Sequence, residues 1–407
     1  MADLELQALE FFERILVLGT HDVILHQWGS PLHDCRGSEA AVMTFALDAT
    51  PLTVPTGGVA RYTGELARAL AETFPEDRYW LFSDQPFTAP TPRPANLFDG
   101  DGPRTAAERR WWLWGLPKAL ARQGVDLFHG TDFSVPYRRS RPSVMTLHDL
   151  SPWMDPAWQP SASRVRRRTP RLLRLGLADM VITPSDAVRR GVIERFSLSP
   201  DRVVAVPLAA GAHFRPGPVP KAAARPAGVP YFLFVGTLEP RKNIARLIEA
   251  WREVRRSQAV DLVLAGRVRH DFEPPSPEPG LKVLGAVPEA DLPELYSGAL
   301  ACVYPSLYEG FGLPVLEAMQ CGAPVIASRD PAILEVAGDA AIAVDATQIR
   351  EMAQAMAAMA SEPARRSEWS DKGRKQAAGF SWTRTARLTR EVYDAALRVH
   401  ARVYARK

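Results

Sequence analysis

Cysteine is scarce in this sequence, and recognisable targeting signals are missing from it. The three cysteines, Cys35, Cys302 and Cys321, follow neither a metal-ligand nor a disulfide spacing, which favours a reducing compartment. The N-terminal stretch MADLELQALE is acidic where a signal peptide needs positive charge, and no apolar run approaches the length of a transmembrane helix. We therefore expect a cytoplasmic protein.

Two common nucleotide-binding motifs are absent as well. No G-x-G-x-x-G follows a predicted strand, which argues against a dinucleotide-dependent dehydrogenase. The G-x-x-x-x-G-K-[ST] loop of P-loop NTPases does not occur either. Neither enzyme class therefore fits the sequence.

Length and composition indicate a soluble globular protein with two domains. The chain has 407 residues, of which 46% are hydrophobic and 24% charged. Its net charge is only +4, but six arginines crowd into RVRRRTPRLLR, residues 164–174. A helix with this load is a solvated face, a phosphate-binding surface or a membrane-surface patch.

Short apolar segments alternate with helical patterns in both halves of the chain. Strands are predicted in AVMTFALDATPL, DLFHG, SVMTLHDL, MVITPS and VVAVPL, and then in YFLFVG, DLVLAG, KVLGAV, LACVYPS and APVIAS. This alternation is typical of parallel sheets that helices cover on both faces. We therefore predict an α/β fold of two Rossmann-like, doubly wound domains facing each other across a cleft.

A stretch rich in proline, alanine and glycine, RPGPVPKAAARPAGVP, divides the two halves. Before the domains lies an extension in which LELQALEFFERILVLG is compatible with one amphipathic helix, and Met43 is a second candidate start of the protein. The predicted organisation is an N-terminal extension of uncertain order (1–42), a first domain (43–215), a linker (216–230), a second domain (231–381) and a terminal helix (382–407).

In parallel sheets, ligands bind beyond the carboxyl ends of the strands. Four stretches lie at such ends. They are Gly57 and Gly58, His148 and Asp149, residues 236–242, and LYEGFGLPVLEAM.

The stretch GTLEPRKNIARLIEAW, residues 236–251, predicts a turn followed by an amphipathic helix. Asn243 is the predicted N-cap of that helix. Arg241 and Lys242 directly precede the cap, where the helix dipole disfavours positive charge. Two cations at this position require an explanation beyond helix formation.

The stretch LYEGFGLPVLEAM carries two carboxylates around a glycine turn. Gly310 and Gly312 leave backbone amides open to a ligand, and Pro314 begins a helix. Glu309 and Glu317 bracket the turn. Taken singly they would be a loop charge and a helix-dipole partner, but as a pair they suit the binding of hydroxyl groups.

Five segments together resemble the retaining glycosyltransferases of family 4, the glycosyl transferases group 1. SLYEGFGLPVLEAMQCGAPVIAS resembles the family's E-x7-E motif, and FVGTLEPRKN resembles its donor-diphosphate motif. GGVARYTGELARAL, DLFHGTDFSVP and VMTLHDLSP are similar to acceptor-domain segments of bacterial mannosyltransferase-like members. The resemblance runs from about Met43 to the C-terminus.

This resemblance implies a GT-B fold, with an N-terminal acceptor domain, a C-terminal donor domain and a last helix that crosses back to the first domain. It also implies transfer of a hexosyl unit, mannosyl by preference, from a GDP- or UDP-linked sugar with retention of the anomeric configuration. The implied acceptor is a saccharide or lipid-linked saccharide in the synthesis of a cell-surface polysaccharide such as lipopolysaccharide.

The resemblance further implies a role for each matching residue. Arg241 and Lys242 would hold the donor's diphosphate, so that the bound anion offsets their repulsion from the helix end, and neither a metal nor another cofactor is expected. Glu309 would hold the transferred sugar, Glu317 the ribose hydroxyls, and His148 the sugar near its anomeric carbon. The implied catalytic residues are Glu309, Arg241, Lys242 and His148. The implied donor-binding residues are Gly57, Gly58, Gly236, Thr237, Arg241, Lys242, Glu309, Gly310, Phe311, Gly312, Leu313 and Glu317.

Two further residues each keep two interpretations. His129, which ends the predicted strand DLFHG, is either a sugar-adjacent contact or a hydrogen-bonded structural residue. Asp149 is either an acceptor contact or the cap of the following turn.

A predicted helix in ERRWWLWGLPKAL, residues 108–120, combines three tryptophans with two arginines. It either packs its aromatic rings onto the sheet or an acceptor cleft, or it acts with the arginines of residues 164–174 in contacting an anionic membrane at the inner face of the cell membrane. No nucleic-acid partner is expected.

Two other functions stay open from the sequence alone. A sugar phosphorylase of the same fold would use inorganic phosphate in the basic pocket. A non-catalytic relative would bind a nucleotide sugar without turnover, but the presence of Arg241, Lys242, Glu309 and Glu317 argues against it.

Overall fold

The computed structural model describes residues 42–54, 57–217 and 228–404. Contacts gather Met43–Lys407 into one compact unit. The predictions made for residues 1–41, and for the central part of the linker at 218–227, lie outside the described residues.

The first of two sheets has seven parallel strands in the order β3-β2-β1-β4-β5-β6-β7. Its strands are β1 (Thr44–Asp48), β2 (Arg78–Phe82), β3 (Leu97–Asp99), β4 (Leu127–Gly130), β5 (Ser143–Thr146), β6 (Met180–Thr183) and β7 (Val203–Ala205). The α-helices of this half are α2 (Gly58–Thr73), α3 (Leu116–Arg122), α4 (Ser163–Arg174) and α5 (Asp186–Phe196).

The second sheet has six parallel strands in the order β10-β9-β8-β11-β12-β13. Its strands are β8 (Tyr231–Val235), β9 (Asp261–Ala265), β10 (Leu281–Gly285), β11 (Ala301–Tyr304), β12 (Val325–Ser328) and β13 (Ile342–Val344). Its helices are α6 (Ile244–Arg255), α7 (Leu292–Gly298), α8 (Leu313–Gln320), α9 (Pro331–Ala337), α10 (Ile349–Ser361) and α11 (Pro363–Ala377).

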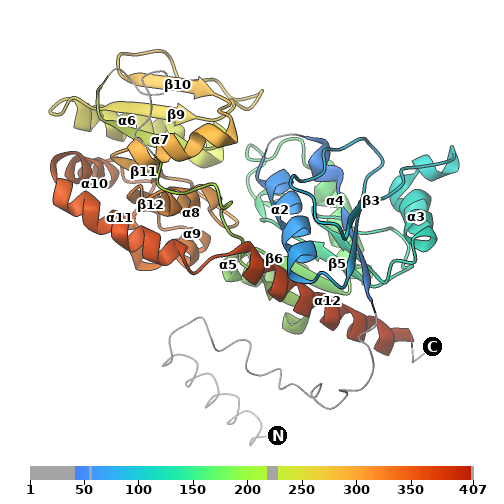
Figure 1. Cartoon of the computed structure of the whole chain (residues 1–407). Helices are drawn as coiled ribbons and strands as arrows, with labels where there is room; N and C mark the ends of the chain where they lie inside the picture. Colours follow the sequence, from blue (N-terminus) through green and yellow to red (C-terminus); the bar gives the residue numbers. More distant parts are fainter. Residues whose placement is uncertain (1–41, 55–56, 218–227, 405–407) are drawn as a thin grey trace, which may run out of the picture. The chain divides into compact units, whose positions relative to one another are not determined.

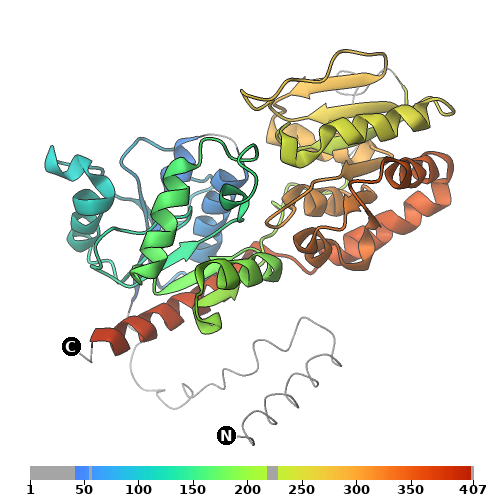
Figure 2. The same cartoon turned by 180° about the vertical axis from the view of Figure 1, so that it is seen from behind.

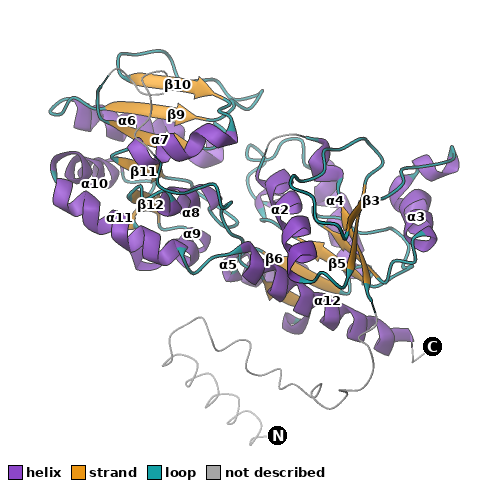
Figure 3. Cartoon of the chain, viewed as in Figure 1, coloured by secondary structure: helices purple, strands orange, loops and turns teal. Residues whose placement is uncertain are grey.

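Both sheets are doubly wound, as Figure 1 shows, and the helices flank the strands in each half (Figure 3). The predicted α/β fold class is therefore confirmed, and every segment predicted as a strand contains one. The central strands β4, β5, β6, β8, β9, β11 and β12 are buried at every position, which explains why they appear in the sequence as continuous apolar runs.

The last helix, α12 (Trp382–Tyr404), packs against α2, β5 and β6 of the first sheet. Figures 1 and 2 show it in red beside these elements from two opposite sides. Tyr393 is fully buried, with its ring centroid 5.1 Å from that of Phe45 in β1. We use "first domain" for the first sheet with α2 to α5 and α12, and "second domain" for the second sheet with α6 to α11.

The predicted single helix at residues 108–120 is wrong, because this stretch forms three short pieces. They are a 3₁₀ turn (Ala107–Arg109), a π-helical turn (Trp111–Gly115) and α3, which has Pro117 in its first turn. A proline lacks the N–H that would continue a preceding helix. Of the tryptophans, Trp111 is buried in the core, whereas Trp114 is 39% exposed.

Candidate functional site

Arg241 and Lys242 occupy the centre of the predicted site. They lie in the 3₁₀ turn Pro240–Lys242 between β8 and α6, where only 8% and 6% of their surfaces are exposed. Arg241 Nη1 donates to the main-chain carbonyl of Tyr308 at 2.8 Å, and Lys242 Nζ donates to Tyr304 Oη at 2.7 Å. Both cations are therefore held in fixed positions inside the protein.

Carboxylates of the chain itself balance these cations. Glu309 accepts hydrogen bonds from Arg241 at 3.0 Å and from Lys242, and Glu239 accepts one from Arg241 at 2.9 Å. Burial acts to raise the pKa of Glu309, but the charges of Arg241 and Lys242 outweigh it and lower the pKa to about 2. The expectation that a bound anion must offset the repulsion of the two cations is therefore wrong, because Glu309 and Glu239 already supply negative charge.

Asn243 occupies the predicted N-cap position of α6, where its main-chain carbonyl accepts from the amide of Leu247 at 3.3 Å. Its backbone is left-handed, with a φ of 59°, and its side chain makes no capping hydrogen bond. Instead, Asn243 Nδ2 donates to the main-chain carbonyls of Ala346 at 2.7 Å and Pro305 at 3.2 Å. The amide thus ties together the loops that follow β11 and β13.

Glu317 lies on α8 and belongs to a separate group of charges. It is only 1% exposed, and its two oxygens accept hydrogen bonds from Tyr296 Oη at 2.9 Å and from Arg61. Burial raises the pKa of Glu317, and the charge of Arg61 opposes this rise. Glu309 and Glu317 are therefore two distinct ion-pair centres rather than one carboxylate pair.

The glycine turn between these glutamates touches the first domain. A Cβ atom at Gly310 would lie 2.0 Å from the main-chain oxygen of His148, and Ser185 Oγ donates to the carbonyl of Gly310 at 2.7 Å. Gly312 has a φ of 101° and directly precedes Leu313, the first residue of α8. The turn therefore needs glycine at 310 for close approach and at 312 for its backbone conformation. Phe311 is buried.

The remaining predicted donor-binding residues lie in two turns. Gly57 and Gly58 are exposed at the start of α2. Gly236 and Thr237 follow β8, where a Cβ atom at Gly236 would lie 4.0 Å from Lys242 Cε. The structure therefore places the second pair beside the buried cations.

His148 and Asp149 follow β5, and both use their side chains within the first domain. His148 Nε2 lies 2.7 Å from the carbonyl oxygen of Thr131, so Nε2 carries the proton, since a carbonyl only accepts. Asp149 Oδ1 accepts from the amide of Ser151 at 2.8 Å and from its hydroxyl at 2.6 Å. Asp149 therefore caps the turn, which is the structural one of its two interpretations.

His129 lies in the core of the first domain. It is fully buried, and its ring nitrogens hydrogen-bond to Tyr393 Oη and to Thr146 Oγ1, both at 2.8 Å. Burial lowers the pKa of His129 to about 3, with a further contribution from His148, so the ring is neutral. Of the two interpretations of His129, the structure therefore supports the hydrogen-bonded structural residue. The side chain is fully buried and not accessible to a ligand.

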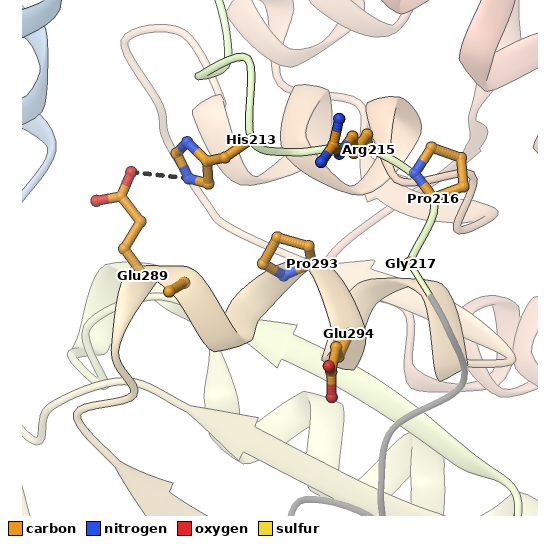
Figure 4. A pocket seen from close by; sticks show the side chains of 8 residues that line it. His213, Arg215, Pro216, Gly217, Glu289, Pro293 and Glu294 are labelled. Carbon is orange, nitrogen blue, oxygen red and sulfur yellow. Dashed lines mark ion pairs between the residues drawn. The ribbon is translucent and has the colours of Figure 1, made fainter. Parts of the chain in front are cut away.

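Three charged residues near Glu317 received no role from the sequence, although one of them, Arg61, lies in the segment GGVARYTGELARAL. Arg61 Nε lies 3.2 Å from Glu289 Oε1, and His213 Nε2 lies 3.1 Å from the same oxygen. Figure 4 shows His213 and Glu289 facing each other in a pocket that is also lined by Arg215, Pro216, Gly217, Pro293 and Glu294. The position of Arg61, one turn after two glycines, is the single sequence signal that could have indicated it.

A second set of contacts joins the domains through Tyr308. Its hydroxyl accepts from the amide of Leu150 at 2.8 Å, and its ring stacks on Trp158 with a centroid separation of 6.0 Å. Arg269 donates to the carbonyls of Ala157 and Trp158, each at 2.7 Å. The loop after β5 is therefore fixed against the second domain by main-chain hydrogen bonds.

Helix α4 presents a basic face to solvent. Arg164, Arg167, Arg171 and Arg174 are exposed, and their spacing of three or four residues places them on one side of the helix. None of the four forms an ion pair with any residue that the structure describes.

Within the described ranges 42–54, 57–217 and 228–404, no three His, Cys, Asp or Glu side chains come together as a potential metal site. No helix in the same ranges combines the length and the apolar character needed to span a membrane.

Comparison with known proteins agrees with this fold. Residues 219–376 match the family model described as Glycosyl transferases group 1, and residues 56–210 match Glycosyltransferase Family 4. The O-antigen chain mannosyltransferase B of Escherichia coli is 32% identical over 381 residues, which cover 84% of this chain and 97% of that protein.

Solved structures share the fold at lower identity. Sucrose-phosphate synthase from Thermosynechococcus elongatus gives a TM-score of 0.65 at 21% identity, covering 90% of this chain and all of that one. HepE from Anabaena, in complex with UDP and glucose, gives 0.63 at 17% identity, covering 87% of this chain and all of that one. Because the mannosyltransferase relative matches along nearly its whole length, the chain belongs to the family 4 glycosyltransferases, the glycosyl transferases group 1, and it has their GT-B fold.

Proposed function

We propose that this glycosyltransferase moves a mannosyl unit from a nucleotide-diphosphate mannose, GDP-mannose by preference, to a saccharide or lipid-linked saccharide acceptor. The product would be part of a cell-surface polysaccharide such as lipopolysaccharide. Similarity to the O-antigen chain mannosyltransferase B of Escherichia coli over 84% of the chain supports the sugar and the class of product.

The buried pair Arg241 and Lys242 is the observation that carries the proposal. A diphosphate offers more negative charge than the carboxylate of Glu309, and a guanidinium and an ammonium can share its oxygens. When the bond between the anomeric carbon and the donor phosphate breaks, negative charge grows on the leaving group. Fixed cations stabilise that charge without having to reorganise. We propose that these two residues, and no metal or other cofactor, neutralise the leaving diphosphate.

Glu309 has a different role in this proposal. With a pKa of about 2 it is ionised at neutral pH, so it accepts hydrogen bonds from sugar hydroxyls and has no proton to give. A carboxylate with so low a pKa is also a weak base, so in this proposal the proton of the acceptor hydroxyl passes to an oxygen of the departing diphosphate. At the same time the bond from the anomeric carbon to that diphosphate breaks and the bond to the acceptor oxygen forms. The diphosphate leaves from, and the acceptor oxygen attaches to, the same face of the sugar, so the anomeric configuration is retained.

The test is calorimetric titration of GDP, UDP, ADP and inorganic phosphate into the wild-type protein and into Arg241→Ala/Lys242→Ala. We expect GDP to bind the wild type and to be lost in the double variant. Binding of phosphate alone would instead identify a sugar phosphorylase, and binding of none would refute a nucleotide-diphosphate donor. A nucleoside diphosphate that binds without any turnover of its sugar conjugate would identify a non-catalytic relative. If a nucleoside diphosphate binds, the corresponding nucleotide sugar is then used as the donor. NMR of the transfer product reports whether the anomeric configuration is retained.

We further propose that the basic face of α4 holds the enzyme at the anionic inner face of the cell membrane. Arg164, Arg167, Arg171 and Arg174 are exposed together, and each arginine near an anionic surface contributes roughly 1 kcal/mol to binding. Leu175, directly after the helix, is 67% exposed and can enter the headgroup region.

Co-sedimentation with phosphatidylglycerol vesicles at low salt tests this contact. Arg167→Glu/Arg171→Glu/Arg174→Glu should abolish sedimentation. The matched control Arg256→Glu/Arg350→Glu/Arg384→Glu makes the same charge change at exposed arginines elsewhere, and it should still sediment. Equal loss in both variants would show that net charge, not α4, is responsible.

A further inference from the structure

Arg61 crosses from the first domain to the glutamate expected to bind the donor's ribose. It lies in the first turn of α2, and its Nη1 donates to Glu317 Oε1. Since the other oxygen of Glu317 accepts from Tyr296 Oη at 2.9 Å, both carboxylate oxygens are engaged. Because Glu317 is also only 1% exposed, a ribose hydroxyl can reach these oxygens only if Arg61 or Tyr296 moves aside.

The partners of Arg61 show that it does not serve its own helix. Its guanidinium contacts Glu317 and Glu289 of the second domain and lies 5.5 Å from the ring centroid of Phe214. Arg68, two turns further along α2, instead pairs with Glu65 and Glu72 of the same helix. Arg61 is thus the cation of α2 that reaches into the expected donor site.

Release of Arg61 from Glu317 is costly unless another anion receives it. Its side chain is only 19% exposed, and release would leave it with Glu289 alone, a partner that is 44% exposed in place of one that is 1% exposed. A nucleotide sugar brings such an anion with it, because its diphosphate is covalently attached to the ribose that competes for Glu317. Gly57 and Gly58, which open α2 just before Arg61, are expected to approach the same diphosphate.

We infer that Arg61 exchanges anions when the donor binds, moving from Glu317 to the diphosphate as a ribose hydroxyl takes its place on Glu317. This inference rests on the proposed function. It makes Arg61 a specificity-determining residue that distinguishes nucleotides from nucleosides. A nucleoside can occupy the ribose site only by leaving Arg61 with Glu289, itself 44% exposed, as its one remaining anion, whereas a nucleoside diphosphate supplies a second.

Binding of GDP and of guanosine to the full-length protein tests the exchange, with calorimetry for GDP and ligand-observed NMR for guanosine. In Arg61→Ala we expect the Kd of GDP to rise about tenfold, because one charge-assisted phosphate contact is lost. The Kd of guanosine should fall by a similar factor, about tenfold, because Glu317 no longer has a competing cation. Arg61→Lys should recover most of the GDP affinity. The control Arg68→Ala, on the same helix, should change neither Kd.

The two Kd values must move in opposite directions. If Arg61→Ala weakens GDP and guanosine by the same factor, Arg61 only maintains the shape of the site, and the inference is wrong. Unchanged values for both ligands overturn it as well. Circular dichroism of each variant verifies the fold. A wild-type protein that binds neither GDP nor UDP refutes the proposed function itself, which is a different result from normal GDP binding that is insensitive to Arg61.

Discussion

Gly310 of the second domain lies directly against the main-chain carbonyl of His148 of the first domain. A Cβ atom at this position would be 2.0 Å from that oxygen and 3.1 Å from Asp149 Cβ. Neither neighbour is the end of a flexible side chain, so one of the two loops must move to admit even a methyl group. The relative position of the two loops thus depends on the missing side chain.

Gly310→Ala should therefore impair catalysis more than folding. The glycine turn and the loop after β5 are forced apart, and small displacements of reacting groups cost up to about a hundredfold in rate. We expect kcat/KM for sugar transfer to fall by about ten- to a hundredfold, while the unfolding midpoint stays within a few degrees of the wild type. Gly64→Ala is the matched control, since a Cβ atom there meets only ordinary contacts and alanine favours the helix by about 1 kcal/mol. Equal activity of the two variants would show that the contact at Gly310 is dispensable.

Glu309→Gln should strengthen the binding of GDP but slow the transfer of the sugar. Removing its charge leaves Arg241 and Lys242 with less negative charge around them, so the phosphates of GDP meet a stronger positive field. We expect the Kd of GDP to decrease several-fold, while transfer slows by at least about a hundredfold because the ionised group beside the sugar is lost. Glu278→Gln, which removes a carboxylate paired with Arg252, should change neither value. Weaker GDP binding in Glu309→Gln would contradict the competition between Glu309 and phosphate.

Asp48 should make the protein less stable as the pH rises from about 4 to about 7. It is buried at the end of β1, and burial raises its pKa to about 7 despite hydrogen bonds from Thr50. The folded state therefore keeps its proton where the unfolded chain has already lost it, and the free energy of unfolding falls through this window. Asp48→Asn cannot ionise, so the variant should gain roughly 2–4 kcal/mol over the wild type between pH 4 and pH 8.

Urea unfolding of both proteins at several pH values measures this difference. Glu309 does not interfere, because its lowered pKa gives a stability that is fully present above about pH 4.5 and is lost only towards pH 2. Parallel pH profiles of the wild type and Asp48→Asn would show that Asp48 does not titrate in this range.

Tyr393→Phe should destabilise the protein without reducing the activity of the folded molecules. The substitution removes the hydroxyl that hydrogen-bonds to His129 Nδ1 and leaves that buried nitrogen without its partner, which costs about 1–3 kcal/mol. Tyr137→Phe removes a hydroxyl from a half-buried ring and should change the free energy of unfolding by less than about 0.5 kcal/mol. Chemical denaturation combined with activity per folded molecule distinguishes this role from a direct contact with the sugar.

The buried strands were predictable from sequence, but three strands at or near the sheet edges were not. β4 (LFHG), β5 (SVMT) and β8 (YFLFV) are buried at every position, and the apolar residues at their centres made them recognisable. β2 begins with the exposed Arg78, and β3 and β13 have only three residues each, so their patterns are too weak or too short to distinguish from loops.

The site, too, contains some residues that were predictable from local sequence and others that were not. Arg241, Lys242 and Glu309 lie in short local motifs, and the structure brings all three together. Arg61 and Glu317 are 256 positions apart, so their ion pair depends on how the two domains meet and leaves no local pattern. The side-chain contacts of the N-cap residue Asn243 were not predictable for the same reason, since its amide bonds to the loops after β11 and β13 rather than to the neighbouring helix.

The position of α12 constrains the order in which the protein can be completed during synthesis. Tyr393, Ala386 and Ala396 are fully buried and belong to the same core as Phe45 in β1, and Thr385 donates to the carbonyl of Pro207. A ribosome that has translated both sheets has therefore still not supplied the helix that closes the first one. Domains generally fold in the order of their synthesis. Here, however, the first domain can complete its core only after α12 has left the exit tunnel. The second domain, whose strands and helices are contiguous in the chain, can fold first.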